Sequence, residues 1–465
     1  MKHKWYIIVL SICLLHTACE EFVDVDLPDN KISSETVFGS DETANAAVMG
    51  IYNELYNLDG FSNGGFRSVT LLGDLSADNL RTITLNQEMS EFQESEIISD
   101  NAYNQTLWSS AYNIIYMCNA VLDGLDTYSG VSNKTRDRLM GEVQFVRAFA
   151  YFYLVNLYGE VPLVQSSDYR QNAMAPRSSI EDIYSAMTTD LESSIHVLGD
   201  SYGEGERWRA NRFTAQALLA RVHLYLENWE KAENHSTEII GSTENFTLLD
   251  HLDDIFLANS KEAIWQITPA GRSLSFVTNE GRILILTSPP PNSQKPVALT
   301  TDLMGSFADE DLRMEHWIGK LDTEDGVYHY PFKYKVNSAN VITEYSMVLR
   351  LAEQYLIRAE ARAHQDNLPG AIADLDKIRT RAHLVPLSII DPGINRAALL
   401  DSIHLERRRE LFTEWGHRWL DLKRTGSVSK VLGIKKPLWQ DTDVLYPIPE
   451  TEIDKNPSLT QNNGY

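Results

Sequence analysis

The chain has 465 residues, 43% of them hydrophobic, and a formal net charge of −24 at pH 7. The hydrophobic fraction is sufficient for a large packed core. The negative charge argues against nucleic-acid binding, which needs a basic surface, and against electrostatic docking on anionic lipid, so uncharged ligands are the class that remains.

The order of residues at the N-terminus is typical of a secretory signal peptide. Lysines precede an apolar run over residues 5–15, which is too short to span a bilayer as a helix, and the small residue Ala18 follows it. A cysteine directly after a small residue suggests a lipoprotein signal, in which the thiol is diacylated and the chain is cut before it. We therefore expect residues 1–18 to be removed and Cys19 to carry a lipid anchor; ordinary cleavage near Ala18, with an incidental thiol at Cys19, is the alternative.

Residues 19–40 are predicted to form an extended, lipidated tether. The acidic residues Glu20, Glu21, Asp24 and Asp26 follow the cysteine. They resemble the surface-export signal of Bacteroidetes lipoproteins, and they fit a merely solvated tether equally well.

The cysteine content excludes an intrachain disulfide after signal removal. Cys13 belongs to the predicted signal and Cys19 to the anchor, which leaves Cys118 alone. Because Cys118 lies in an apolar helical pattern, we expect it to be buried as a small hydrophobic residue.

Residues 41–465 are predicted to form a single, mainly α unit. Helical patterns cover residues 41–57, 103–125, 134–158 and 178–198, and the glycine-rich stretch 58–100 is expected to be irregular. Aromatic residues at helical or strand spacing are expected in the core, namely Trp108, Tyr112, Phe149, Tyr153, Trp265 and Trp419.

A weak internal repeat aligns residues 220–232 with residues 359–371 without gaps. Both copies have small residues on a helix, an acid–Asn turn, and an alanine that opens a second helix. This pattern predicts tetratricopeptide-like helix pairs, each of which must stack on a neighbour to bury its apolar face. Two unrelated helical hairpins are the alternative.

Between the two repeats, residues 242–343 are predicted to form a loop-rich insertion with strands at 262–268 and 328–335. Long loops on rigid scaffolds usually hold the binding surface. The sequence then predicts helices at 344–365, 369–382 and 396–415, and a loop-like tail at 446–465.

The C-terminal segment 406–424, ERRRELFTEWGHRWLDLKR, strongly resembles the signature of the SusD/RagB family. The tail 446–465, the helix exit at 147–163 and the motif LGDLSADN at 72–79 resemble further family motifs, in the family order. The resemblance spans the whole mature chain.

The resemblance implies a scaffold of tetratricopeptide-like helix pairs, with a ligand face made of loop-rich insertions and a few short strands. It also implies an outer-membrane lipoprotein that acts as a lid on a SusC-like, TonB-dependent transporter and captures oligosaccharides or polysaccharides at the cell surface. No cofactor and no catalysis are implied. Oligopeptide capture, as in the RagB branch, is the alternative, and a surface hydrolase is a third.

Sugar binding requires aromatic rings that pack on the C–H faces of pyranoses and planar polar groups that bind the hydroxyls. Aromatic residues in the irregular regions are therefore candidates: Phe61, Phe66, Phe276, Trp317, Tyr328 and Tyr330. Replacing Trp317 with alanine is expected to weaken glycan binding without unfolding the protein. Polar candidates come from the family's N-terminal loop, where Asp74 and Asn79 match the motif and Arg81 follows; capping of their own turns is the alternative role.

The sequence contains no recognisable catalytic motif and no metal-binding motif. Glu406 and Glu410 share one helix face with arginines, a pattern more typical of a solvated or salt-bridged face than of a catalytic acid pair. His417 has no histidine or cysteine at ligand spacing, so zinc is not expected.

Overall fold

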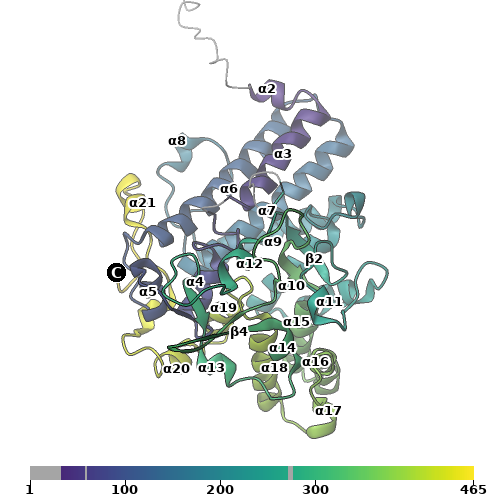
Figure 1. The fold of residues 1–465 in the computed structure, drawn as a ribbon. Helices are drawn as coiled ribbons and strands as arrows, with labels where there is room; N and C mark the ends of the chain where they lie inside the picture. Colours follow the sequence, from purple (N-terminus) through teal and green to yellow (C-terminus); the bar gives the residue numbers. More distant parts are fainter. Residues whose placement is uncertain (1–32, 58–59, 271–275) are drawn as a thin grey trace, which may run out of the picture.

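The computed structural model describes residues 33–57, 60–270 and 276–465 (Figure 1). The predicted signal peptide, Cys19 and most of the predicted tether lie outside these residues. Within the described part of the chain, no helix is both long enough and apolar enough to cross a membrane. The end of the predicted tether is not extended: it contains the helical turn α2 (Ser34–Val37), which forms because the Ser33 hydroxyl accepts a hydrogen bond from the Thr36 amide.

The four predicted N-terminal helices are confirmed as α3 (Asp41–Leu55), α6 (Ala102–Thr127), α7 (Asn133–Tyr158) and α9 (Ile180–Val197). Helix α7 carries the aromatic residues of the core: the Phe149 ring lies edge-on against Trp265 and Trp415, at centroid distances of 4.9 and 5.2 Å. Trp108, Tyr153 and Trp419 are buried, and Tyr112 packs against the same core, as expected. Cys118 is fully buried and unpaired.

The stretch between α3 and α6 is not irregular, as the glycines had suggested. It contains α4 (Val69–Ser76), strand β1 (Leu80–Thr82) and α5 (Gln87–Glu94). The side chains of Ser68 and Asn86 cap the two helices, and every residue of α4 is buried, so α4 has no amphipathic period for sequence analysis to detect.

The internal repeat corresponds to two helical hairpins, α10 (Arg212–Tyr225) with α11 (Trp229–Gly241), and α15 (Leu351–His364) with α16 (Leu368–Arg381). The hairpins stack directly, because α11 packs along α15. The small residues Ala220 and Ala361 are fully buried in one shared cluster, which allows the helices to approach closely.

The turns of the two hairpins have the same geometry. Glu227 and Asp366 both adopt left-handed backbone conformations, with φ of 57° and 62°. The amide of the asparagine that follows each of them donates to a carbonyl five residues earlier, at 2.9 Å in both copies. The Trp229 ring lies parallel to the His364 ring, with centroids 3.8 Å apart. The acid–Asn turn predicted from the repeat is thus confirmed.

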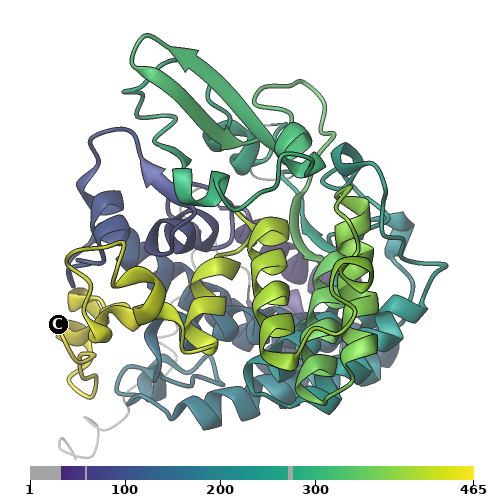
Figure 2. The same cartoon turned by 90° about the horizontal axis from the view of Figure 1, so that it is seen from below.

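The helices form one continuous stack (Figures 1 and 2). Consecutive helices pack on one another in the order α6, α7, α9, α10, α11, α15, α16. Helix α18 (Arg396–Leu411) packs on α15 and α16. This arrangement confirms a mainly α, tetratricopeptide-like scaffold.

The described strands form three antiparallel pairs. Strand β1 pairs with β3 (Val297–Leu299), β2 (Ala263–Ile267) with β6 (Ser346–Arg350), and β4 (Ile318–Thr323) with β5 (Gly326–Pro331). The β4–β5 hairpin projects from the helical body (Figure 2). The remaining short elements are α8 (Tyr169–Asn172), η3 (Gly203–Gly205), η4 (Leu252–Asp254), α12 (Asn279–Leu284), α13 (Thr301–Met304), α14 (Leu312–Trp317), α17 (Leu387–Ile390), α19 (His417–Arg424), α20 (Val428–Leu432), η5 (Asp441–Val444) and α21 (Glu450–Lys455).

Several predicted boundaries differ from the structure. The helix predicted at 344–365 begins as strand β6, in which all five residues are buried, so its periodicity does not distinguish strand from helix. The strand predicted at 328–335 ends at Pro331, and the tail contains α21. The helix predicted at 396–415 ends at Leu411, because Thr413 and Trp415 have φ of 54° and 49°, which a right-handed helix does not accommodate.

Helix α4 crosses the turn before α19 at a close contact between two glycines. A Cβ atom on Gly73 would lie 2.8 Å from the Cα atom of Gly416, and Gly416 itself has a φ of 65°. Both positions therefore require glycine. This contact joins the motif at 72–79 to the C-terminal signature.

Candidate functional site

A groove of about 630 Å³ lies beside β1. It is lined by Leu80 and Arg81 of β1 and by Ala77 and Asp78 before this strand. The C-terminal end of α5, the start of α13 and residues 435–438 after α20 complete the lining. We call it the Arg81 groove. Its volume lies within the range of small-molecule sites in proteins, roughly 300–1,000 Å³.

One predicted ligand residue, Arg81, lines this groove, and a second, Tyr328, lies against the Arg81 side chain. The guanidinium carbon of Arg81 lies 5.3 Å from the centroid of the Tyr328 ring. Strand β3 brings them together, because it pairs with β1, placing Arg81 opposite Ala298, and also packs beside β5. Both side chains are half-buried, so each retains surface for a ligand.

The charged residues that line the groove are balanced, with three basic side chains, Arg81, Lys435 and Lys436, and three acidic ones, Asp78, Glu94 and Asp302. The Lys435 ammonium lies 2.6 Å from a carboxylate oxygen of Asp78 and 2.7 Å from one of Asp302. A groove of this kind has no strong preference for an anion or a cation. It suits an uncharged ligand with many hydroxyl groups.

Two of these charged groups are fixed by the protein itself. Burial opposes ionisation of Asp78, but hydrogen bonds from Arg418 and Lys435 and the charge of Arg408 hold the pKa of its carboxyl below the usual range. The Lys436 ammonium donates to the backbone carbonyls of Leu75 and Ser76, and burial lowers the pKa of Lys436 to about 7. These groups shape the floor of the groove.

Gln93 and Asp302 were missed by sequence reasoning. Gln93 Oε1 accepts hydrogen bonds from the amide and the hydroxyl of Thr82, at 2.6 and 3.0 Å. Asp302 accepts from Arg408 at 2.7 Å, across more than one hundred residues of sequence. No local motif marks either residue, because tertiary packing alone brings them to the groove.

Asp74 and Asn79 are not at the ligand surface, contrary to expectation. Both are fully buried, and Asn79 donates to Asp74 at 3.3 Å. Asp74 also accepts the Thr413 amide at 2.5 Å, and Asn79 Oδ1 accepts from Arg408 at 3.0 Å. Burial raises the pKa of Asp74 to about 7. The motif therefore anchors the turn that follows α18.

Phe61 and Trp317 are also core residues, which corrects their assignment to the ligand surface. Phe61 lies 6.0 Å from the ring centroids of both Phe149 and Tyr153. The Trp317 indole N–H donates to the Leu252 carbonyl at 3.1 Å, and Lys333 Nζ lies 4.7 Å from its ring centroid. Neither side chain has significant exposed surface.

The other aromatic candidates differ in exposure. Phe66 is half-buried against the core, whereas Phe276 is 44% exposed. Tyr330 lies on β5 two residues beyond Tyr328, is half-buried, and covers Gly319 on the paired strand. Of these rings, within the described residues, Tyr328 is the one that packs against a side chain lining the Arg81 groove.

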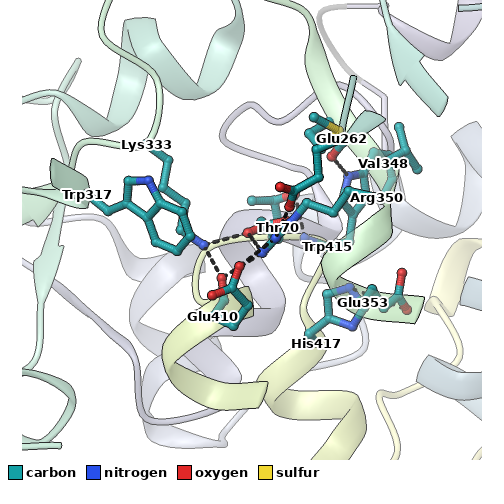
Figure 3. Close-up of polar contacts among 12 residues, drawn as sticks. Thr70, Glu262, Trp317, Lys333, Val348, Arg350, Glu353, Glu410, Trp415 and His417 are labelled. Carbon is teal, nitrogen blue, oxygen red and sulfur yellow. Dashed lines mark hydrogen bonds and ion pairs between the residues drawn. The ribbon is translucent and has the colours of Figure 1, made fainter. Parts of the chain in front are cut away.

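The C-terminal signature forms a buried charge network (Figure 3). Glu410 lies 2.6 Å from Arg350 and 3.1 Å from Arg313, and it also contacts Arg381. Arg350 further bonds Glu262 at 3.0 Å and Glu414 at 2.7 Å. The network thus joins β6, α16 and α18 to Glu262 and Arg313 of the insertion. The predicted salt bridges are present, but the partners of Glu406 and Glu410 are arginines of other elements and not of the same helix, and the face is buried and not solvated.

These carboxylates are not available for acid–base chemistry on a surface ligand. Burial opposes ionisation of Glu410, yet the charges of Arg381, Arg350 and Arg313 hold its pKa far below the usual range. Glu406 is buried 2.6 Å from Arg313. A general acid needs a proton near neutral pH and access to substrate, and Glu410 has neither.

His417 is buried behind the same turn, and burial together with the charges of Arg221 and Arg407 lowers its pKa well below the usual value. Among the described residues, no group of three or more His, Cys, Asp or Glu side chains is arranged to hold a metal ion.

Two protein families match this sequence. Residues 21–224 match a family described as "Starch-binding associating with outer membrane", and residues 323–465 match one described as "SusD family". The SusD-like protein P25 of Formosa agariphila is 26% identical over an alignment that covers 99% of this chain and 98% of that protein.

Solved structures share the fold. A SusD superfamily protein from Bacteroides vulgatus superposes with a TM-score of 0.82 at 20% identity, covering 92% of this chain and all of that one. A structure described as a laminarin-binding SusD-like protein superposes with a TM-score of 0.75 at 23% identity, covering 91% of this chain and 99% of that one.

Proposed function

The chain belongs to the SusD/RagB family, and from this premise we propose that it is a cell-surface glycan-binding lipoprotein whose Arg81 groove captures neutral oligosaccharides. One observation carries the assignment of the site: Arg81 lines a groove whose lining charges are balanced, and the Tyr328 ring lies against the Arg81 side chain. The guanidinium offers planar donors for hydroxyl groups, and the ring offers a face for pyranose C–H groups.

The hydrogen bonding at the free edge of β1 favours an uncharged sugar polymer over a peptide as the ligand. A peptide that added a strand there would need the Thr82 amide as a donor. That amide already donates to Gln93 at 2.6 Å. The balanced charges and the description of one matching family as starch-binding agree with a glycan.

The proposal extends to how the protein is used. Lipid on Cys19 would anchor the chain to the outer membrane, and the groove would present glycans to a SusC-like, TonB-dependent transporter, over which the protein acts as a lid. Acylation of Cys19 would be sufficient for this role, since two or three acyl chains at about 0.8 kcal/mol per buried CH₂ give a stable anchor. Binding and transfer require no catalytic group, and no enzymatic activity is proposed.

The test uses calorimetry on a ligand found by screening the purified full chain against a glycan array that includes starch and laminarin oligosaccharides. Tyr328→Ala removes the ring. An aromatic side chain has ~150–250 Å² of surface, and a sugar that covers one face of the ring removes about a third of this area, ~50–80 Å², from water. At ~25 cal/mol per Å² this corresponds to ~1.3–2 kcal/mol, a loss of affinity of about 10- to 30-fold.

The matched control is Val327→Ala, an exposed neighbour whose side chain points to the opposite face of β5. Tyr328→Phe keeps the ring and is expected to retain most of the affinity. Equal affinities for the unaltered chain and Tyr328→Ala would remove this groove as the glycan site, and release of reducing ends from the bound glycan would establish a hydrolase.

A further inference from the structure

A second groove, of about 420 Å³, lies on another part of the surface. It is formed by one face of α6, by α8 and the segment before it, and by α21 with the tail that follows (Figure 1). We call it the Tyr169 groove. Trp108 and Tyr112 lie at its base, where Trp108 is buried and the Tyr112 hydroxyl donates to the Pro162 carbonyl at 2.8 Å.

Two tyrosines of this groove keep their rings in solvent. Tyr116 on α6 is 52% exposed and Tyr169 on α8 is 70% exposed, although both line the same concavity. Most other aromatic side chains of α6 and α7 are buried in the core. Exposed rings from two separate elements around a hollow are a binding feature, since neither ring stabilises the fold by burial.

The polar groups of the groove leave acceptors for hydroxyl groups. Glu452 Oε1 takes hydrogen bonds from Gln105 at 3.2 Å and Lys455 at 2.9 Å, and within the described residues its second oxygen has no protein donor. Asn172 uses its amide N–H on the Ser166 carbonyl at 2.7 Å. Glu452 and Lys455 balance each other in charge, so this groove also has no strong preference for an ion.

We propose that the Tyr169 groove is a second binding site for a neutral oligosaccharide segment; this rests on the proposed glycan-binding function. The two grooves are connected through the scaffold, because α5 lines the Arg81 groove, α6 lines the Tyr169 groove, and α5 packs against α6. A polysaccharide long enough to occupy both grooves would meet the second at a raised effective concentration. On this proposal we expect long chains to bind more tightly than short ones.

Affinity electrophoresis of the purified full chain, in gels that contain laminarin, soluble starch or no polysaccharide, tests the proposal. Tyr116→Ala with Tyr169→Ala is expected to weaken retardation by the bound polysaccharide about fivefold or more. The paired Tyr→Phe variant keeps both rings and is the matched control, with a change below about twofold. Combining the two alanine substitutions with Tyr328→Ala is expected to abolish retardation.

The outcomes separate this inference from the proposed function. Lack of retardation of the unaltered chain by any polysaccharide in a panel that includes laminarin and starch would overturn both. Retardation of the unaltered chain and of the double alanine variant to the same extent would overturn the second site alone. If the double alanine variant is retarded like the unaltered chain but no longer co-purifies with a membrane protein that the unaltered chain retains, the groove is a protein-binding surface. That outcome would also refute a glycan there.

Discussion

Glu410→Gln tests whether the buried charge network holds the ligand-bearing insertion on the scaffold. The substitution keeps the shape of the side chain and removes its charge. Glu410 contacts Arg350 at 2.6 Å, Arg313 at 3.1 Å, and Arg381. All four side chains are buried, so no water replaces the lost charge.

The magnitude depends on the partners that remain. Arg350 keeps Glu262 and Glu414, whereas Arg381 keeps only Glu262, at 2.7 Å. Breaking a buried ion pair by removing one partner costs about 3–5 kcal/mol. Because each arginine retains a carboxylate, we expect a loss near the lower end, about 3 kcal/mol in the free energy of unfolding at pH 7.

The effect of pH has a definite sign. The pKa of Glu410 is lowered in the folded state, so its contribution is present above the unfolded value of about 4.3 and is lost as the pH falls below it. The difference between the unaltered chain and Glu410→Gln should therefore be full at pH 7 and shrink below about pH 4.

Urea unfolding of the full chain, followed by tryptophan fluorescence at pH 7 and pH 3, measures this difference. Glu450→Gln, which neutralises an exposed carboxylate at the start of α21, is the control and should leave the midpoint unchanged. A Glu410→Gln variant as stable at pH 7 as the control would refute the reasoning that these charges are desolvated and mutually dependent.

Two further predictions follow from buried residues of the insertion. Trp317→Ala should lower the free energy of unfolding by about 3–5 kcal/mol, because it leaves a cavity beneath Lys333. The folded variant should bind glycan with unchanged affinity. Weaker binding without loss of stability would contradict the place of Trp317 in the core. Burial raises the pKa of Glu280 to about 7, so the folded protein holds this proton more tightly than the unfolded chain. The resulting contribution to stability is full below about pH 4.5 and is lost as the pH rises through 7. Glu280→Gln should therefore make the melting temperature less dependent on pH between about 5 and 8, and parallel curves for the two proteins would show that Glu280 does not titrate there.

The helix pairs could be predicted from the sequence because their signal is local. The acid–Asn turn recurs at Glu227 and Asp366, and in each copy it fixes the left-handed residue that ends the first helix. Periodicity identified the long helices for the same reason. It missed α4 and β6, whose residues are all buried, since such segments have no polar face.

The candidate site could be predicted only in part, because an irregular segment in the sequence is not the same as an exposed one in the fold. Tyr328 and Trp317 both belong to the predicted insertion, and residue type gave no reason to separate them. The difference arises from long-range contacts: Trp317 bonds the Leu252 carbonyl and lies against Lys333, whereas β5 carries Tyr328 out beside Arg81. Insertion and scaffold share one continuous core, in which the Trp317 ring is buried. Tertiary packing therefore decides which rings remain accessible to a ligand. Tyr328 remains accessible because it lies outside this core, against the half-buried Arg81 side chain.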